Sequence, residues 1–114
     1  MRTVHTYSVR LLPFDKGFAE WNKKIEISFP LRVESKYFPL SIGRDYLYPE
    51  YRVVKIERKE NQEIAHCVFA GLSIGGECRY EKKDVRPSLM DRVIHDRLER
   101  SGWEMVGHRI YPRV

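Results

Sequence analysis

Cysteine and histidine, the residues that most often bind metals or act as nucleophiles, are few in this chain. Cys67 and Cys78, together with His66, could supply three ligands to a zinc ion. Structural zinc sites usually pair their ligands at short spacings such as C-x-x-C and hold the ion with four of them. Neither feature is present, so we expect no bound metal and interpret both cysteines as free thiols of a reducing compartment.

A second chemical pattern surrounds His95, which lies one residue from Asp96 and four from Asp91. A histidine oriented by a carboxylate can act as a general base, but the same spacing is typical of ordinary ion pairs on a helix surface. The chain has no G-x-S-x-G sequence, and the glycines between 71 and 76 lack the Gly-Lys-Ser/Thr ending of a phosphate-binding loop. We therefore expect no catalysis and no cofactor, with an unrecognised small enzyme as an alternative.

The segment from 35 to 52 has the strongest claim to a binding role. It contains Pro39, Gly43 and Pro49, which argue against any long helix or strand. Long loops in compact domains are usually functional or disordered, and tyrosine and arginine are enriched at binding hot spots. The alternative is that its tyrosines pack the loop onto the sheet. The predicted partner-binding residues are Tyr37, Arg44, Asp45, Tyr46, Tyr48 and Arg52.

The charge of the chain constrains the kind of partner. The net charge is +5, but the excess is scattered and forms no basic block. A mild excess of this kind is typical of a solvated surface. We therefore expect a binding or regulatory module with a protein partner. The alternative is a weak nucleic-acid-binding domain that uses the basic-aromatic loop, and self-association is also compatible with the sequence.

Length and composition are those of one small globular domain. The chain has 114 residues, of which 42% are hydrophobic and 32% charged, so we expect a single domain over 1–114. No apolar run approaches the roughly 18 residues of a membrane-spanning helix. Apolar and polar residues alternate from the start of the chain, and the N-terminal residues contain no apolar core of a signal peptide. A cytoplasmic location without membrane contact is the resulting expectation.

Alternating apolar and polar residues predict most of the elements that must position these groups. Strands are expected at 3–12, 24–29, 77–81 and 103–111, with a hairpin formed by 51–58 and 63–70. A short helix is expected from Asp15 through Trp21. The strand at 63–70 has apolar residues on both faces. This pattern predicts a central strand that is covered on each side or offers one face to a partner.

A long helix is expected from Ser88 to Ser101. Ser88 and Asp91 suit a capping box, and Gly102 and Trp103 suit a Schellman ending in which Trp103 packs on Leu98. The expected apolar stripe consists of Leu89, Met90, Val93, Ile94 and Leu98.

The segment 98–106 also resembles the helix end of certain small bacterial domains of unknown function, in which Gly-Trp-Glu follows a helix and opens a strand. The resemblance implies no activity. The elements together predict an α+β fold, a single mostly antiparallel sheet of about five strands with one long C-terminal helix packed on one face. A ferredoxin-like arrangement is the runner-up, if the helix that begins at Asp15 forms.

Overall fold

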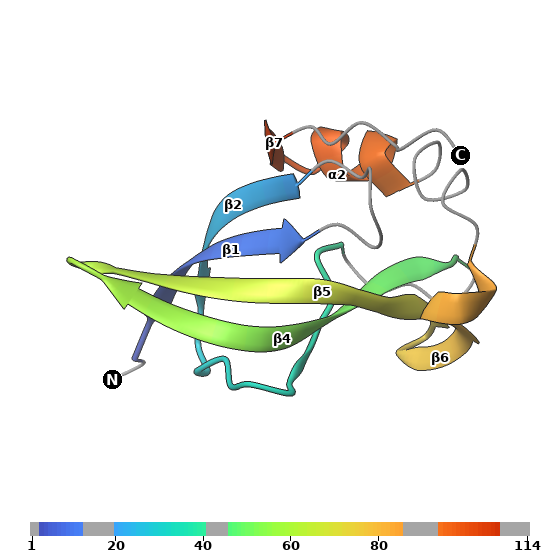
Figure 1. Cartoon of the computed structure of the whole chain (residues 1–114), viewed down its shortest axis with the longest axis horizontal. Helices are drawn as coiled ribbons and strands as arrows, with labels where there is room; N and C mark the ends of the chain where they lie inside the picture. The colour runs from blue at the N-terminus through green and yellow to red at the C-terminus, as the bar shows by residue number, and fades with distance from the viewer. Residues whose placement is uncertain (1–2, 13–19, 41–45, 86–93, 108–114) are drawn as a thin grey trace.

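The computed structural model describes residues 3–12, 20–40, 46–85 and 94–107. Most of them are in strands, and two short helical segments follow late in the chain (Figure 1). The strands are β1 His5–Leu12, β2 Glu20–Ile27, β3 Lys36–Tyr37, β4 Tyr48–Lys59, β5 Gln62–Ile74, β6 Glu77–Glu81 and β7 Glu104–Gly107. The helical segments are the 3-10 turn η1 Lys82–Asp84 and the α-helix α2 His95–Arg100.

The predicted fold class is wrong, because the described chain is mostly β. Its strands form one seven-stranded sheet instead of about five strands with a long helix. Residues 88–93 of the predicted long helix lie outside the described residues, and the helix that is described has six residues. So short a helix is marginal by itself, and tertiary contacts must stabilise it. Helical spacing near one end of a sequence is a local signal, and it does not report how many strands the rest of the chain forms.

The ferredoxin-like runner-up is also wrong. Trp21, predicted to end a helix, lies in β2 and pairs with Leu11 of β1. Trp21 and Ile25 fall on the same side of β2, in phase with the apolar side of β1. Pairing with β1 therefore outweighs the capping signal of Asp15, which itself lies outside the described residues.

The strand order is β3-β4-β5-β1-β2-β7, and β6 also pairs with β5. The predicted hairpin is confirmed and is longer than expected, with β4 and β5 paired from Tyr48–Ser73 to Lys59–Gln62. β5 is the central strand, because its other side pairs first with β1 and then with β6. The β1–β5 pairing is parallel, and the other described pairings are antiparallel.

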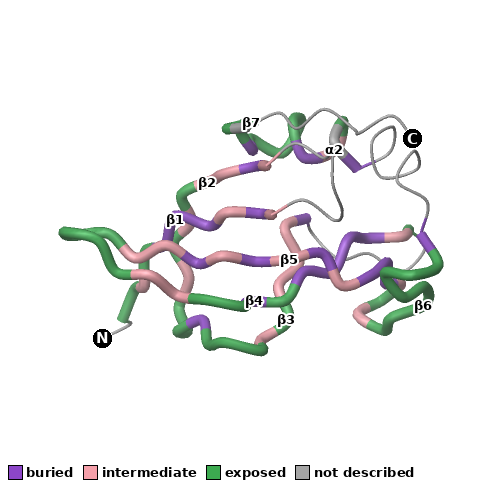
Figure 2. Tube along the Cα trace, viewed as in Figure 1, coloured by how far each residue is buried: buried purple, intermediate pink, exposed green. Residues whose placement is uncertain are grey.

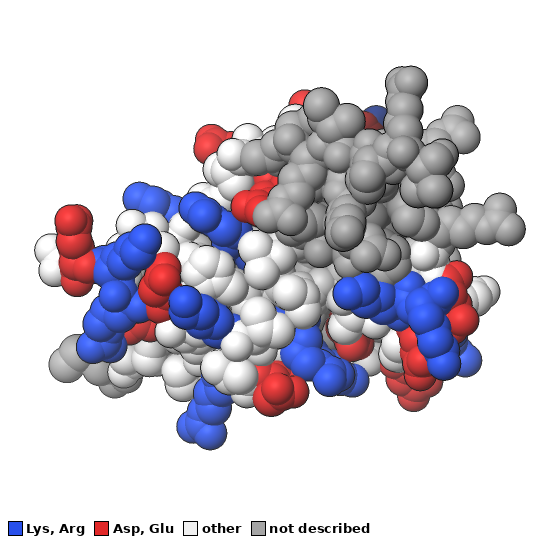
Figure 3. Space-filling model, in the orientation of Figure 1, with Lys and Arg blue, Asp and Glu red and all other residues white. Residues whose placement is uncertain are grey.

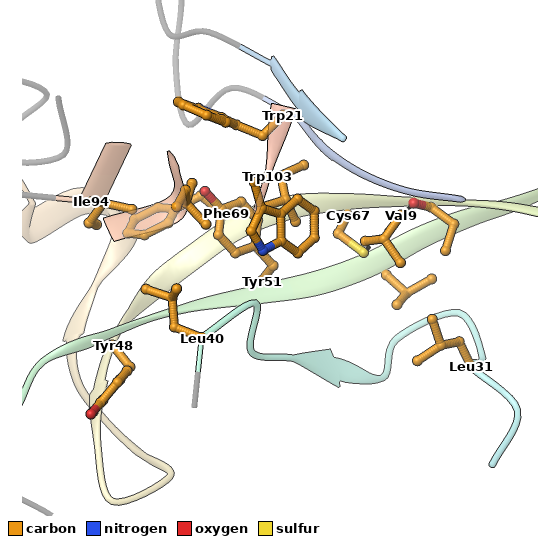
Figure 4. Packing of buried hydrophobic residues seen from close by; sticks show 14 of the residues in the cluster. Val9, Trp21, Leu31, Leu40, Tyr48, Tyr51, Cys67, Phe69, Ile94 and Trp103 are labelled. Carbon is orange, nitrogen blue, oxygen red and sulfur yellow. Dashed lines mark hydrogen bonds between the residues drawn. The ribbon is translucent and has the colours of Figure 1, made fainter. Parts of the chain in front are cut away.

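Residues 28–40, which follow β2, cover one face of this curled sheet, which we call the inner face. The backbone N–H of Leu31 donates to the Tyr7 hydroxyl at 2.9 Å, and the Trp103 indole N–H donates to the Pro39 carbonyl at 3.2 Å. The ring of Tyr37 on β3 meets Trp103 edge-on at 6.3 Å. Tyr37 of β3 and Trp103, the residue before β7, thus meet although the two strands lie at opposite ends of the strand order, and Trp103 belongs to the buried cluster drawn in Figure 4.

The two faces of β5 differ sharply in burial. Ala65, Cys67 and Phe69 point to the inner face and are at most 1% exposed. Ile64 and Val68 alternate with them on the opposite side, which we call the outer face, and are only partly buried (Figure 2). The expectation of a central strand with apolar groups on both faces is therefore confirmed. The outer face carries apolar side chains that the described residues do not fully cover.

The end of α2 forms the predicted Schellman motif. The N–H of Trp103 donates to the Leu98 carbonyl at 3.1 Å, and the N–H of Gly102 donates to the Glu99 carbonyl at 3.2 Å. Gly102 has a φ of 87°, which suits glycine at this position. The Lys23 ammonium donates to the Ser101 carbonyl at 2.7 Å and so ties the helix end to β2.

Candidate binding groove on the outer face

The four predicted partner-binding residues that the structure describes do not form one surface. Tyr37 packs on Trp103, and burial, with a smaller contribution from the Cys67 thiol, raises its pKa far above the ordinary value. Tyr48 is 9% exposed and lies under the Arg97 guanidinium, 4.6 Å from its ring centroid. Of the six, Tyr46 and Arg52 are exposed, while Arg44 and Asp45 lie outside the described residues.

Arg52 lies at a groove of about 940 Å³ on the outer face, which we call the outer groove. Its floor is apolar and its rim is mostly basic. The floor includes Val68, Ala70 and Val85, and the charged groups around it are Lys36, Glu50, Arg52, Glu81, Lys82 and Lys83. These residues come from β3, β4, β5, β6 and η1 and the residue that follows it.

Strand register places the side chains of the outer groove next to one another. Lys36 of β3 is the cross-strand partner of Arg52 on β4, so two basic side chains lie next to each other. The β4–β5 register shifts beside Ala70, and beyond that shift β5 pairs with β6. A side chain at Gly71 would collide with the Tyr80 carbonyl oxygen. Glycine there lets β6 approach closely, which places η1 with Lys82 at the groove.

The carboxylate of Glu50 is the least exposed charged group of the groove, at 3%. It accepts a hydrogen bond from the Ser73 hydroxyl at 3.1 Å, and the Lys36 ammonium lies 3.9 Å from the same oxygen. Lys83 pairs with Glu81 at 3.4 Å. Two of the basic groups are therefore largely neutralised within the groove.

Arg52, in contrast, makes no ion pair or hydrogen bond with any side chain that the structure describes. On the face that Figure 3 shows, the basic and acidic side chains of the described residues are interspersed, without one large basic block. Arg52 can therefore form an ion pair with an acidic group of a ligand without first losing an ion pair with a described carboxylate.

The two cysteines have different environments. Cys67 is fully buried in the core, and burial raises the pKa of its thiol to about 12. Cys78 is exposed on β6, at the groove. Cys78 is the cross-strand partner of Ser73. Ser73 lies six residues from Cys67 along β5, so the Cα atoms of these two residues are about 20 Å apart. A disulfide needs Cα atoms within about 7 Å, so this fold does not allow one between them.

We expect one fast and one protected thiol in the folded protein. Cys78 should react with Ellman's reagent under native conditions, whereas Cys67 should react only after unfolding, because it is both inaccessible and protonated. Counting thiols before and after adding urea tests this, with Cys78→Ser as the control that should abolish the fast phase. Equal native rates for the two thiols would contradict the burial of Cys67.

The described residues provide neither a metal site nor a membrane-spanning helix. Within the four described ranges, no three His, Cys, Asp or Glu side chains gather as a metal site would require. No described helix has the length and apolar character to cross a membrane.

No protein-family model, curated protein or solved structure matches this chain.

Proposed function

We propose that this chain is a small non-catalytic binding module that takes up a segment of another protein in the outer groove. The observation that supports it is the groove itself, about 940 Å³ with a partly exposed apolar floor and basic groups at its rim. Binding sites are typically concave and apolar, with a few polar groups that fix orientation. The floor suits apolar side chains of a partner, and the rim suits carboxylates spaced between them.

Nucleic acid is the less favoured partner for this groove. Single-stranded nucleic acid binds to continuous positive grooves with aromatic rings on which bases stack. Phe69 is the aromatic residue of the groove lining and is 1% exposed, so it offers no stacking surface. Lys36 and Lys83 are already paired with Glu50 and Glu81, so the rim lacks the continuous positive charge that a nucleic-acid backbone needs. An extended peptide with alternating apolar and acidic residues suits this arrangement better.

A designed peptide tests the proposal even while the natural partner is unidentified. The probe is a short peptide in which Leu alternates with Glu, and its control replaces every Glu with Lys. Titration into ¹⁵N-labelled protein should shift the amide signals of Val68 and Ala70, and the control peptide should not. Arg52→Glu should weaken binding at least about fivefold, which corresponds to ~1 kcal/mol.

Arg32→Glu is the matched control variant, because Arg32 is exposed and is not part of the groove. It should bind the acidic peptide within about twofold of wild type, well below the effect of a hot-spot residue. An equal loss in both variants would show that net charge, and not the groove, drives binding. A single-stranded oligonucleotide that binds more tightly than the peptide, with affinity falling steeply with salt, would favour the nucleic-acid alternative instead.

A further inference from the structure

Two neighbouring side chains on the outer face each hold a buried nitrogen atom with no hydrogen-bond partner. Arg10 of β1 and His66 of β5 are Cα partners in the parallel pairing of these strands. Arg10 Nε and His66 Nε2 are both buried, and neither finds an acceptor or donor in the described structure. Unsatisfied buried polar atoms are rare in native proteins, because burial without a partner loses the hydrogen bonds that water would supply.

The carboxylate of Glu57, which lies beside His66, does not satisfy the imidazole nitrogen. Glu57 Oε2 lies 3.7 Å from His66 Nε2, which is beyond hydrogen-bond distance. The same carboxylate group lies 3.5 Å from the Lys55 ammonium and 3.8 Å from that of Lys59, so two lysines already balance its charge. Arg10 has no ion pair with any carboxylate of the described ranges. Its charge is permanent at any physiological pH.

Strand register connects this pair to the outer groove. Arg52 of β4 is the partner of Val68 on one side of β5, and Arg10 of β1 is the partner of His66 on the other side. Two strand spacings and two residues along the strand separate the Cα atoms of the two arginines by about 12 Å. Both side chains are long and emerge on the outer face, so they can converge on one ligand group above β5.

We infer that Arg10, His66 and Arg52 form an oxyanion subsite that anchors the docked segment. The inference rests on the proposed function, since the segment supplies the anion. The shared chemistry is that of a carboxylate or a phosphate, because a guanidinium donates two parallel hydrogen bonds to either group. His66 lies beside Arg10 in the register and adds a further ring nitrogen to the subsite.

The experiment observes the arginine side chains directly. Side-chain ¹H–¹⁵Nε signals are recorded while the Leu/Glu peptide, the same peptide with one phosphoserine in place of Glu, or inorganic phosphate is added. The Arg10 signal, assigned from its loss in Arg10→Gln, should shift with at least one of the three probes. The Leu/Glu peptide and its phosphoserine version are then compared in affinity, and the tighter of these two tells whether a carboxylate or a phosphate is the natural group.

Arg10→Gln should weaken peptide binding at least about fivefold, whereas Arg32→Gln should not. The thermal midpoint of Arg10→Gln should not fall, because Arg10 Nε has no described partner to lose. A lower midpoint with unchanged affinity would assign Arg10 a structural role and overturn the inference. Unchanged affinity in Arg10→Gln, with loss in Arg52→Glu, would overturn the subsite but leave the groove proposal standing. An Arg10 signal that none of the three probes shifts would overturn the subsite, even if the peptide binds to the protein.

Discussion

Replacing Phe69 with alanine should lower the free energy of unfolding by about 3–5 kcal/mol. Phe69 lies on the central strand β5, is 1% exposed, and meets the ring of Tyr51 on β4 edge-on at a centroid distance of 5.7 Å. The substitution removes a large apolar group and leaves a cavity that rigid neighbouring strands cannot fill. Urea denaturation followed by circular dichroism measures the change.

Phe29→Ala is the matched control, because the same chemical change is made at a side chain that is 60% exposed. Its effect should stay within about 0.5 kcal/mol of wild type. The comparison cancels intrinsic differences between phenylalanine and alanine in the unfolded chain. If the two variants lost the same stability, Phe69 could not be the buried core residue that the structure places on β5.

Leu98→Ala should lower the free energy of unfolding by about 2–5 kcal/mol. Leu98 is 0% exposed and belongs to the same hydrophobic cluster as Trp103. A six-residue helix is too short to be stable alone, so α2 depends on this anchor. The backbone carbonyl of residue 98, which accepts from the Trp103 N–H, is retained in the variant. The loss therefore reports side-chain packing and not the helix cap.

Met105→Ala provides the comparison, since Met105 is apolar and of similar size but 54% exposed on β7. It should change stability by no more than about 0.5 kcal/mol. A Leu98→Ala variant as stable as Met105→Ala would show that α2 does not dock on the sheet.

Docking of α2 also affects the start of β4. Arg97 of this helix donates to the Leu47 carbonyl and lies over the ring of Tyr48. Glu50, the buried carboxylate of the outer groove, follows two residues later on the same strand. Loss of the Leu98 anchor should thus weaken peptide binding as well as stability, whereas Phe29→Ala should change neither.

Part of the candidate site could be predicted from residue type. The aromatic and basic character of the loop at 35–52 predicts a binding role, and Arg52 does lie at the groove. Tyr37 and Tyr48 have the same residue types as exposed hot spots, but the structure packs them against Trp103 and Arg97. Residue type alone does not distinguish a tyrosine that binds a partner from one that packs a loop, because both uses need its large ring.

The remaining site residues carry no sequence signal. Arg10, His66 and Glu50 are single charged or polar residues within or beside alternating strands. Arg10 and His66 meet through the parallel β1–β5 pairing, which joins segments more than 50 residues apart. Glu50 meets Ser73 and Lys36 because β4 pairs with β5 and with β3. No local pattern specifies which distant strands pair, so neither the groove nor the subsite could be located from the sequence.

The features that the sequence alone specifies are local. Alternation marked β1, the β4–β5 hairpin and β6, and Gly102 with Trp103 marked the end of α2, because side-chain periodicity and φ preference act between near neighbours in the chain. Contacts between distant parts of the chain specify that the described strands form a single curled β-sheet, that β1 runs parallel to β5, and that one face of β5 is partly open. These outcomes depend on which distant apolar faces bury each other, and burial is a property of the assembled chain.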